Sequence, residues 1–124
     1  HLKILKTNLD QSENIKVAIP VLGKIVFIAT NEILYMKGEG AYTNIFKIDG
    51  SQLLVSRNLK SFEDLFEAVP SMIRIHRSYI ANTKHIIAIG KTDGGFVEFS
   101  DNNQIPVSQE KINEILETVK LMKR

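Results

Sequence analysis

Residues 73–82, which read IRIHRSYIAN, hold the side chains of this sequence that are best suited to contact a phosphate or a base. The segment begins with the alternation of a half-buried strand, which places Ile73 and Ile75 on one face and Arg74 and His76 on the other. We therefore expect the isoleucines to lie in the core and the two nitrogen-rich side chains to lie on the opposite face of the strand.

The alternation breaks at Arg77-Ser78, where a loop can present side chains outward from a rigid sheet. An arginine there can clamp a phosphate or pair through two hydrogen bonds with guanine O6 and N7, and a serine can bind a phosphate. A second interpretation is that His76 and Asn82 cap local backbone groups while Arg77 is only solvated. The residue types alone leave both interpretations open.

The charge pattern sets this segment apart. The chain of 124 residues has a net charge of only +2, but no acidic residue lies between Ala68 and Thr92. The basic side chains of this stretch are Arg74, Arg77, Lys84, Lys91 and two histidines. The acids gather elsewhere, mainly in Glu63, Asp64, Glu67, Glu110, Glu114 and Glu117. A basic segment on a nearly neutral domain indicates a site for an anion, although a solvated face has the same composition.

Catalytic and metal-binding patterns are missing from the sequence. The three histidines, at positions 1, 76 and 85, lack metal-ligand spacing, and the absence of cysteine excludes disulfides and thiolate zinc sites. Gly38-Glu39-Gly40 lacks the third glycine and the helical pattern of a dinucleotide fold, and neither a G-x-S-x-G elbow nor a P-loop is present. We therefore predict a binding protein that is not an enzyme and needs no metal or cofactor.

Short runs of apolar residues, separated by turn residues, predict strands for most of the chain. The expected strands are 16–21, 25–28, 33–37, 42–48, 52–55, 86–89, 96–99 and 104–107. Residues 29–32 suit a single helical turn, and residues 38–40 suit a loop. Hairpin turns are expected where the residue types tolerate positive φ, at Asp49-Gly50-Ser51, Asp93-Gly94-Gly95 and Asp101-Asn102-Asn103.

Two amphipathic helices interrupt the strands and brace the β body. The first repeats Leu59, Phe62, Leu65, Phe66 and Val69 at helical spacing, with Asn58 as its N-cap and Pro70 as its stop. The second repeats Ile112, Ile115, Leu116, Val119 and Met122, with Ser108 as its N-cap. The predicted fold class is mainly β with flanking helices (α+β).

The length and composition of the chain fit one folded domain. Hydrophobic residues make up 44% and charged residues 24%, which are ordinary globular values. No apolar run approaches the roughly 20 residues needed to span a bilayer. Because the chain begins with His1 rather than Met and residues 1–14 are polar, we expect a linker or tag remnant over 1–14 and a domain over 15–124.

Four segments, taken in order and spacing, carry a family resemblance. They are ILYMK at 33–37 followed by YTNI at 42–45, Leu59-Lys60 with Leu65, IHRSYIAN at 75–82, and IPVS at 105–108. Together these segments resemble the signatures of LytTR domains, the DNA-binding halves of many bacterial two-component response regulators. The resemblance covers about residues 15–120, nearly the whole chain.

The resemblance implies short antiparallel strands in small stacked sheets. It also implies that loops between strands, rather than a recognition helix, enter the major groove of duplex DNA. Carried over by position, base reading falls on Tyr42 with its neighbours Thr43 and Asn44, on Arg77, and on Gln109. Many members of the family have Arg where this chain has Gln109. Glutamine prefers adenine N6 and N7 where arginine prefers guanine, so the base recognised at that position stays open.

Further candidate contacts flank these positions. His76 and Ser78 belong to the main signature, and Ser108 with the backbone N–H groups behind it forms a helix N-terminus, which attracts anions. Glu39, in the predicted loop, would repel phosphates or accept a hydrogen bond from cytosine N4. Candidate phosphate contacts, which fix register without carrying sequence information, are Lys37, Arg57, Lys84 and Lys111.

These inferences lead to one main hypothesis and two alternatives. The main hypothesis is sequence-specific binding of duplex DNA in the cytoplasm, as the output domain of a response regulator. An upstream receiver domain, once phosphorylated, would bring two such domains onto paired half-sites as a dimer. The first alternative is a protein-interaction module whose basic face meets an acidic partner. The second is single-strand binding, which usually needs exposed aromatic side chains, whereas only Tyr42 and Tyr79 lie near the basic segment.

Overall fold

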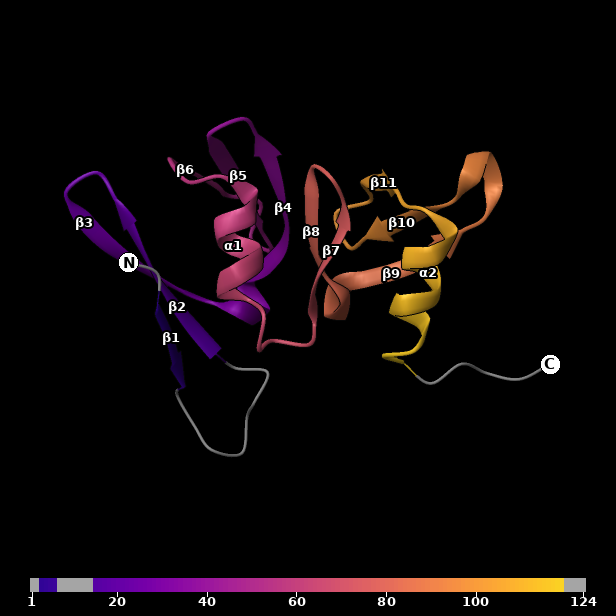
Figure 1. Cartoon of the computed structure of the whole chain (residues 1–124), viewed down its shortest axis with the longest axis horizontal. Coiled ribbons are helices and arrows are strands. Elements are labelled where there is room, and N and C mark those ends of the chain that lie inside the picture. The colour runs from indigo at the N-terminus through magenta and orange to yellow at the C-terminus, as the bar shows by residue number, and fades with distance from the viewer. Residues whose placement is uncertain (1–2, 7–14, 120–124) are drawn as a thin grey trace.

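Three small antiparallel sheets follow one another across the computed structural model, with α1 next to the first two and α2 next to the third (Figure 1). The structure describes residues 3–6 and 15–119. The first sheet contains β1 (Lys3–Lys6), β2 (Ile15–Val21) and β3 (Lys24–Ala29). The central sheet contains β4 (Ile33–Glu39), β5 (Tyr42–Lys47), β6 (Gln52–Val55), β7 (Met72–His76) and β8 (Tyr79–Asn82). The third contains β9 (Ile86–Gly90), β10 (Phe96–Phe99) and β11 (Gln104–Pro106). The helices are α1 (Leu59–Leu65) and α2 (Gln109–Leu116), with short 3-10 turns η1 (Thr30–Glu32), η2 (Thr83–His85) and η3 (Thr92–Gly94).

The central sheet, with strand order β6-β5-β4-β8-β7, separates two hydrophobic cores. Successive side chains of a strand point to opposite faces of a sheet. Met36 on β4 and its partners Ile45 and Ile80 therefore face the first core, whereas Tyr35 and its partner Phe46 face the second. The strands that carry the two faces are thus supported from both sides.

The first core joins the first sheet and α1 to one face of the central sheet. Phe62 of α1 is fully buried there, together with Ile19 of β2 and Ile45 of β5. The helix starts at Asn58, whose side chain accepts a hydrogen bond from the Ser61 N–H at 3.0 Å, as the sequence predicted. Removing a side chain as large as Phe62 from such a core costs about 3–5 kcal/mol.

The second core joins the third sheet and α2 to the other face of the central sheet. Ile112 of α2 and Phe99 of β10 are fully buried there. The Tyr35 ring packs on Phe99 with 4.8 Å between ring centroids, and its hydroxyl donates to Asp101 at 3.2 Å. Burial, with the negative charge of Asp101 second, raises the pKa of Tyr35 from 10.0 to about 12. Tyr35 therefore ties the central sheet to the β10–β11 turn.

The predicted fold class is confirmed, and most predicted elements are found within a residue or two of their expected positions. The three hairpin signals each join antiparallel strands, and each turn has a residue with positive φ, at 89° for Gly50, 88° for Gly94 and 70° for Asn102. Residues 30–32 form the single helical turn that was expected. The residue types of these turns thus predicted the hairpin connections correctly.

The loop expected at residues 38–40 is shorter than predicted, because Gly38 belongs to β4. A Cβ placed on Gly38 would lie 2.9 Å from the Cβ of Leu59, closer than side-chain contacts permit. This glycine therefore allows the start of α1 to approach the strand. The turn itself consists of Gly40 and Ala41.

The first helix is also shorter than its apolar spacing indicated. It ends at Leu65, and the chain continues in turns in which Phe66 and Val69 are still buried. A residue that precedes proline is disfavoured in the helical region, so the helix does not resume at Val69 before Pro70. The apolar side chains reach the core even though the helix has ended.

Two further differences lie at the ends of the described chain. Strand β1, within the expected linker, pairs with β2 and was not predicted, because the polar composition of residues 1–14 indicated a linker. Val119, expected in the stripe of the second helix, is half exposed, and Met122 lies outside the described residues. No helix in the described part of the chain is long and apolar enough to cross a membrane.

Candidate nucleic-acid interface

Two hairpin turns lie together at one edge of the central sheet. Gly40 and Ala41 connect β4 to β5, and Arg77 and Ser78 connect β7 to β8. The turns are neighbours because β4 pairs with β8, and the Gly38 N–H donates to the Ser78 carbonyl at 2.8 Å. Both tips point to the upper edge of the molecule in Figure 1. The two main signatures of the sequence are therefore brought to one place.

The predicted contact residues of β4 and β5 share one face of the central sheet, with one exception. Glu39 is paired with Tyr42, and Lys37 is paired with Asn44. Because side chains alternate along a strand, all four point to the side of the second core, beyond its buried part. Glu39 and Tyr42 are exposed, and Lys37 and Asn44 are half-buried. The Asn44 amide donates to Gln52 at 2.8 Å.

Thr43 is the exception. Its side chain points to the opposite face, is fully buried, and donates its hydroxyl hydrogen to the Arg57 carbonyl at 2.8 Å. A buried hydroxyl that is already hydrogen-bonded does not reach a base, so the expectation of a direct contact from Thr43 is corrected. Its position instead anchors the backbone of Arg57, whose exposed side chain follows β6 at the same edge.

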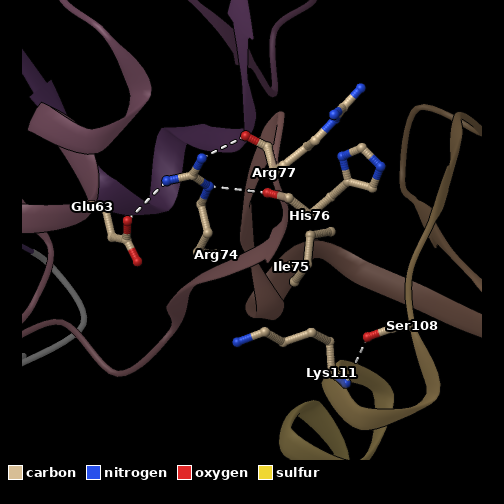
Figure 2. Close-up of a pocket in the computed structure, with 7 residues that line it drawn as sticks. All are labelled: Glu63, Arg74, Ile75, His76, Arg77, Ser108 and Lys111. Carbon is tan, nitrogen blue, oxygen red and sulfur yellow. Dashed lines mark hydrogen bonds and ion pairs between the residues drawn. The ribbon is translucent and has the colours of Figure 1, made fainter.

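The turn between β7 and β8 is held by the side chain of Arg74. The Arg74 Nε donates to the His76 carbonyl at 3.0 Å, and Nη2 donates to the Arg77 carbonyl. Nη1 donates to the Glu63 carboxylate of α1 at 2.8 Å (Figure 2). One guanidinium thus ties the turn to the helix beside it.

The side chain of Arg77 points outward from this turn and is exposed, as predicted (Figure 2). Its guanidinium makes no hydrogen bond or ion pair with any residue that the structure describes. The His76 Nδ1 accepts a hydrogen bond from the Ser78 N–H at 3.0 Å, so the neutral ring carries its proton on Nε2, away from the turn. The ring packs edge-to-face on Tyr79, with 5.6 Å between centroids.

The capping interpretation of the sequence is also confirmed for two residues. His76 caps the turn as described above, and Asn82 is buried at the far end of β8. The Asn82 amide donates to the carbonyls of Thr30 and Ile33 at 3.0 and 2.9 Å, and its oxygen accepts from the Lys84 N–H at 3.1 Å. Asn82 is therefore structural, whereas the Arg77 guanidinium has no partner among the described residues and can bind a ligand.

An open groove of about 600 Å³ connects this turn to the start of α2 (Figure 2). Its lining comes from three elements distant in sequence, and consists of Glu63, Arg74, Ile75, His76, Arg77, Ser108 and Lys111. Two arginines, a lysine and a histidine line it against one acid, which is already paired with Arg74. The arginines, the lysine and the acid of the lining therefore sum to a net positive charge, which favours an anion such as phosphate.

The start of α2 supplies the far wall of this groove. The Ser108 hydroxyl accepts from the Lys111 N–H at 3.3 Å, which is the predicted N-cap. The Lys111 ammonium lies 3.3 Å from Glu114, on a partly exposed side chain. Gln109 is exposed beside the groove and donates to Asn113 at 3.1 Å. The partly exposed ion pair between Lys111 and Glu114 adds little stability, so Lys111 can exchange it easily for a contact with a ligand.

Lys84 does not join the other predicted contacts. It belongs to η2, at the opposite end of β8 from the Arg77 turn. A strand rises about 3.3 Å per residue, which places Lys84 on the order of 15 Å from that turn. The structure therefore separates Lys84 from the edge that carries Tyr42 and Arg77.

Sequence reasoning did not identify the partnership between Arg74 and Glu63. The alternation of the strand placed Arg74 on the polar face, but Glu63 lies eleven residues earlier, on a helix. The apolar spacing of α1 does not show that the Glu63 side chain contacts β7. Only the excess of acids around Glu63, beside an acid-free segment, pointed towards such a pairing.

The fold and the site define a class: a small β protein that presents cationic and aromatic side chains from adjacent strand turns and from one helix start. The family model of the LytTr DNA-binding domain matches residues 23–120. The chain belongs to this family.

Two known proteins are similar to the chain. An uncharacterized response regulatory protein of Vibrio cholerae is 34% identical over 91 residues, which cover 69% of this chain and 34% of that protein. The matched part thus spans about a third of that relative's length. A solved LytTr DNA-binding domain from Bacillus cereus has the same fold, with a TM-score of 0.65 at 23% identity, covering 82% of this chain and 94% of that one.

Proposed function

We propose that this domain binds duplex DNA sequence-specifically and regulates transcription as the output domain of a response regulator. One observation carries the proposal: the Arg77 guanidinium is exposed and unpaired among the described residues, on a turn whose backbone is held rigidly. A rigid turn with a free planar fork is the geometry that pairs with guanine O6 and N7 in a major groove.

Base reading falls to four residues at the edge and beside the groove. These are Tyr42, Asn44, Arg77 and Gln109. Tyr42 is 47% exposed, so it offers a hydroxyl and a ring to a base. His76 contributes its Nε2, and Ser78 lies in the turn beside it. Thr43 is left out because it is buried.

Backbone contacts fall to the cations around these readers. Lys37, Arg57 and Lys111, with the N-terminus of α2 behind Ser108, supply phosphate contacts that fix register. Glu39 limits non-specific binding, because an exposed carboxylate beside Tyr42 repels phosphates. Lys84 is left out because it lies at the other end of β8.

The response regulatory protein of Vibrio cholerae supports a proposal for the regulatory arrangement. That protein is named a response regulatory protein and extends well beyond the matched region. We infer an upstream receiver domain in the intact protein and a dimer on paired half-sites after phosphorylation, because two tethered domains bind far more tightly than one.

Selection from a random duplex library tests the proposal. We expect a defined site to be enriched and then bound more tightly than random duplex, single-stranded DNA or an acidic protein. Affinity for duplex should fall with salt, with a log–log slope of about −0.9 for each neutralised phosphate and three to six such contacts. A flat salt plot, or stronger binding to the acidic protein, would favour the protein-interaction alternative.

A further inference from the structure

We propose that Arg74 is a positioning residue, which holds the β7–β8 turn in the conformation from which Arg77 reads a base. Arg74 itself does not touch the DNA. This inference rests on the proposed function of Arg77 and adds the device that makes it selective.

The β7–β8 turn needs a restraint from side chains because its backbone lacks the positive φ that is usual in two-residue turns. Two residues, Arg77 and Ser78, separate the paired residues His76 and Tyr79. The two-residue turns that match the twist of paired strands have positive φ at one or both positions. Neither Arg77 nor Ser78 is among the described residues with positive φ. The register also shifts between Arg74 and His76.

The contacts of Arg74 supply the missing restraint. The two carbonyls that it binds, those of His76 and Arg77, belong to the peptide groups on either side of the Arg77 Cα. Both peptide planes of the proposed reader are thereby fixed. The remaining nitrogen, Nη1, donates to Glu63 at 2.8 Å, so all three nitrogens of the guanidinium are engaged within the protein.

Glu63 orients this guanidinium from α1. Its side chain is 40% exposed, and a pair at such a site adds little stability by itself. Its effect is geometric, because it selects the rotamer in which Arg74 reaches both carbonyls. Because α1 packs in the first core, that core helps to orient the β7–β8 turn that carries Arg77.

The test is a double-mutant cycle between Arg74→Lys and Arg77→Ala, with the ratio of random to selected-site dissociation constants as the readout. Lysine keeps the charge but lacks the planar fork that spans two carbonyls and a carboxylate. We expect Arg74→Lys to lower this selectivity ratio about tenfold, within the range of couplings between contacting residues. On the Arg77→Ala background it should lower selectivity no further.

Four results would overturn the inference. Unchanged affinities for both DNAs in Arg74→Lys would mean that a charge is sufficient, as at a phosphate contact. Equal losses of affinity for both DNAs in Arg74→Lys would mean an effect on the whole fold. Unchanged selectivity in Arg77→Ala would refute the base-reading role of Arg77, and the positioning role with it. An additive cycle with a selective loss in Arg77→Ala would refute the positioning role alone.

Two further variants protect the test against a folding defect. Glu63→Gln leaves Arg74 in place but removes the charge that orients it, and should lower selectivity in the same direction by a smaller factor. Glu67→Gln is the matched control, since it makes the same change at an exposed acid just after the same helix, and Glu67 forms no ion pair with any residue that the structure describes. It should leave selectivity unchanged, and a loss as large as that of Glu63→Gln would contradict the proposal.

Discussion

The two turns at the proposed DNA edge are built in opposite ways. The β4–β5 turn has a positive φ of 64° at Gly40 and none at Ala41, the pattern of a type II′ turn, and its tip stands in open space. The β7–β8 turn has no positive φ and is held from outside by Arg74 and His76. The first turn is shaped by its own backbone, whereas the second depends on the side chains of Arg74 and His76.

The difference assigns different roles to the two turns. Contacts that fix the backbone of a turn before binding reduce the entropy cost of ordering it, which favours a directional base contact from that turn. Side chains beside an unattached tip adapt more easily to phosphates or water-mediated contacts. We therefore expect Arg77 to carry more selectivity than Tyr42.

The largest expected effect comes from the support beneath the second turn. Ile75 is 2% exposed in the second core, directly below the turn. Ile75→Ala should destabilise the fold by about 2–4 kcal/mol, through lost burial and a residual cavity. Denaturant unfolding measures this, and a cost below about 1 kcal/mol would show that the turn does not rest on the core in this way.

The second core also predicts a pH dependence, through Tyr35. Its pKa, raised from 10.0 to about 12 by burial and Asp101, means that the fold favours the neutral phenol. That contribution is fully present below about pH 10 and is lost as the pH rises towards 12, in total roughly 2–3 kcal/mol. Tyr35→Phe should flatten this alkaline loss when unfolding is followed from pH 8 to 12. An unchanged slope in the variant would place the titration elsewhere.

The first turn is tested by Gly40→Ala. A side chain at a φ of 64° costs about 1–2 kcal/mol, even though nothing lies near the new Cβ. Ser78→Ala should stay within about 0.5 kcal/mol, because that position has no positive φ. Thermal unfolding of both variants decides whether the two turns differ as described, and equal costs would remove the contrast.

The smallest effect is expected for Glu39→Ala. Glu39 is exposed beside Tyr42, so its removal should leave stability unchanged. Random duplex should bind more tightly by less than about 1 kcal/mol, while selectivity relaxes. If both affinities stay the same, the β4–β5 turn does not approach the DNA.

The sequence predicted what short-range patterns determine. Gly50 and Asn102 predicted the turns in which they lie, and Asn58 and Ser108 predicted the starts of the two helices. The alternation at 73–76 predicted which side chains of β7 are buried and which are polar. These features depend on residues a few positions apart, so a single sequence contains them.

The remaining features arise from contacts between distant segments. The alternation of side chains along β5 exposes Tyr42 and buries Thr43. The predicted contact of Thr43 with a base came from the family motif and did not take this alternation into account. Gly38 was read as a loop residue because the approach of Leu59 is not visible in the sequence. The groove between Arg77 and Ser108 exists only because α2 packs on the second core, beside β7.

The central claim is that Arg77 reads a base, and the most direct test compares Arg77→Ala, Arg77→Lys and Lys84→Ala on the selected site and on random duplex. Arg77→Ala should leave the melting temperature nearly unchanged and cost about 1–3 kcal/mol on the selected site, with much less loss on random duplex. Arg77→Lys should lose most of the same selectivity, because lysine lacks the planar fork. Lys84→Ala, the matched loss of one positive charge far from the edge, should leave selectivity intact. Arg77 is not a base reader if Arg77→Ala unfolds the domain or lowers the affinity for both DNAs equally. The same conclusion holds if Arg77→Lys retains the selectivity of the native domain.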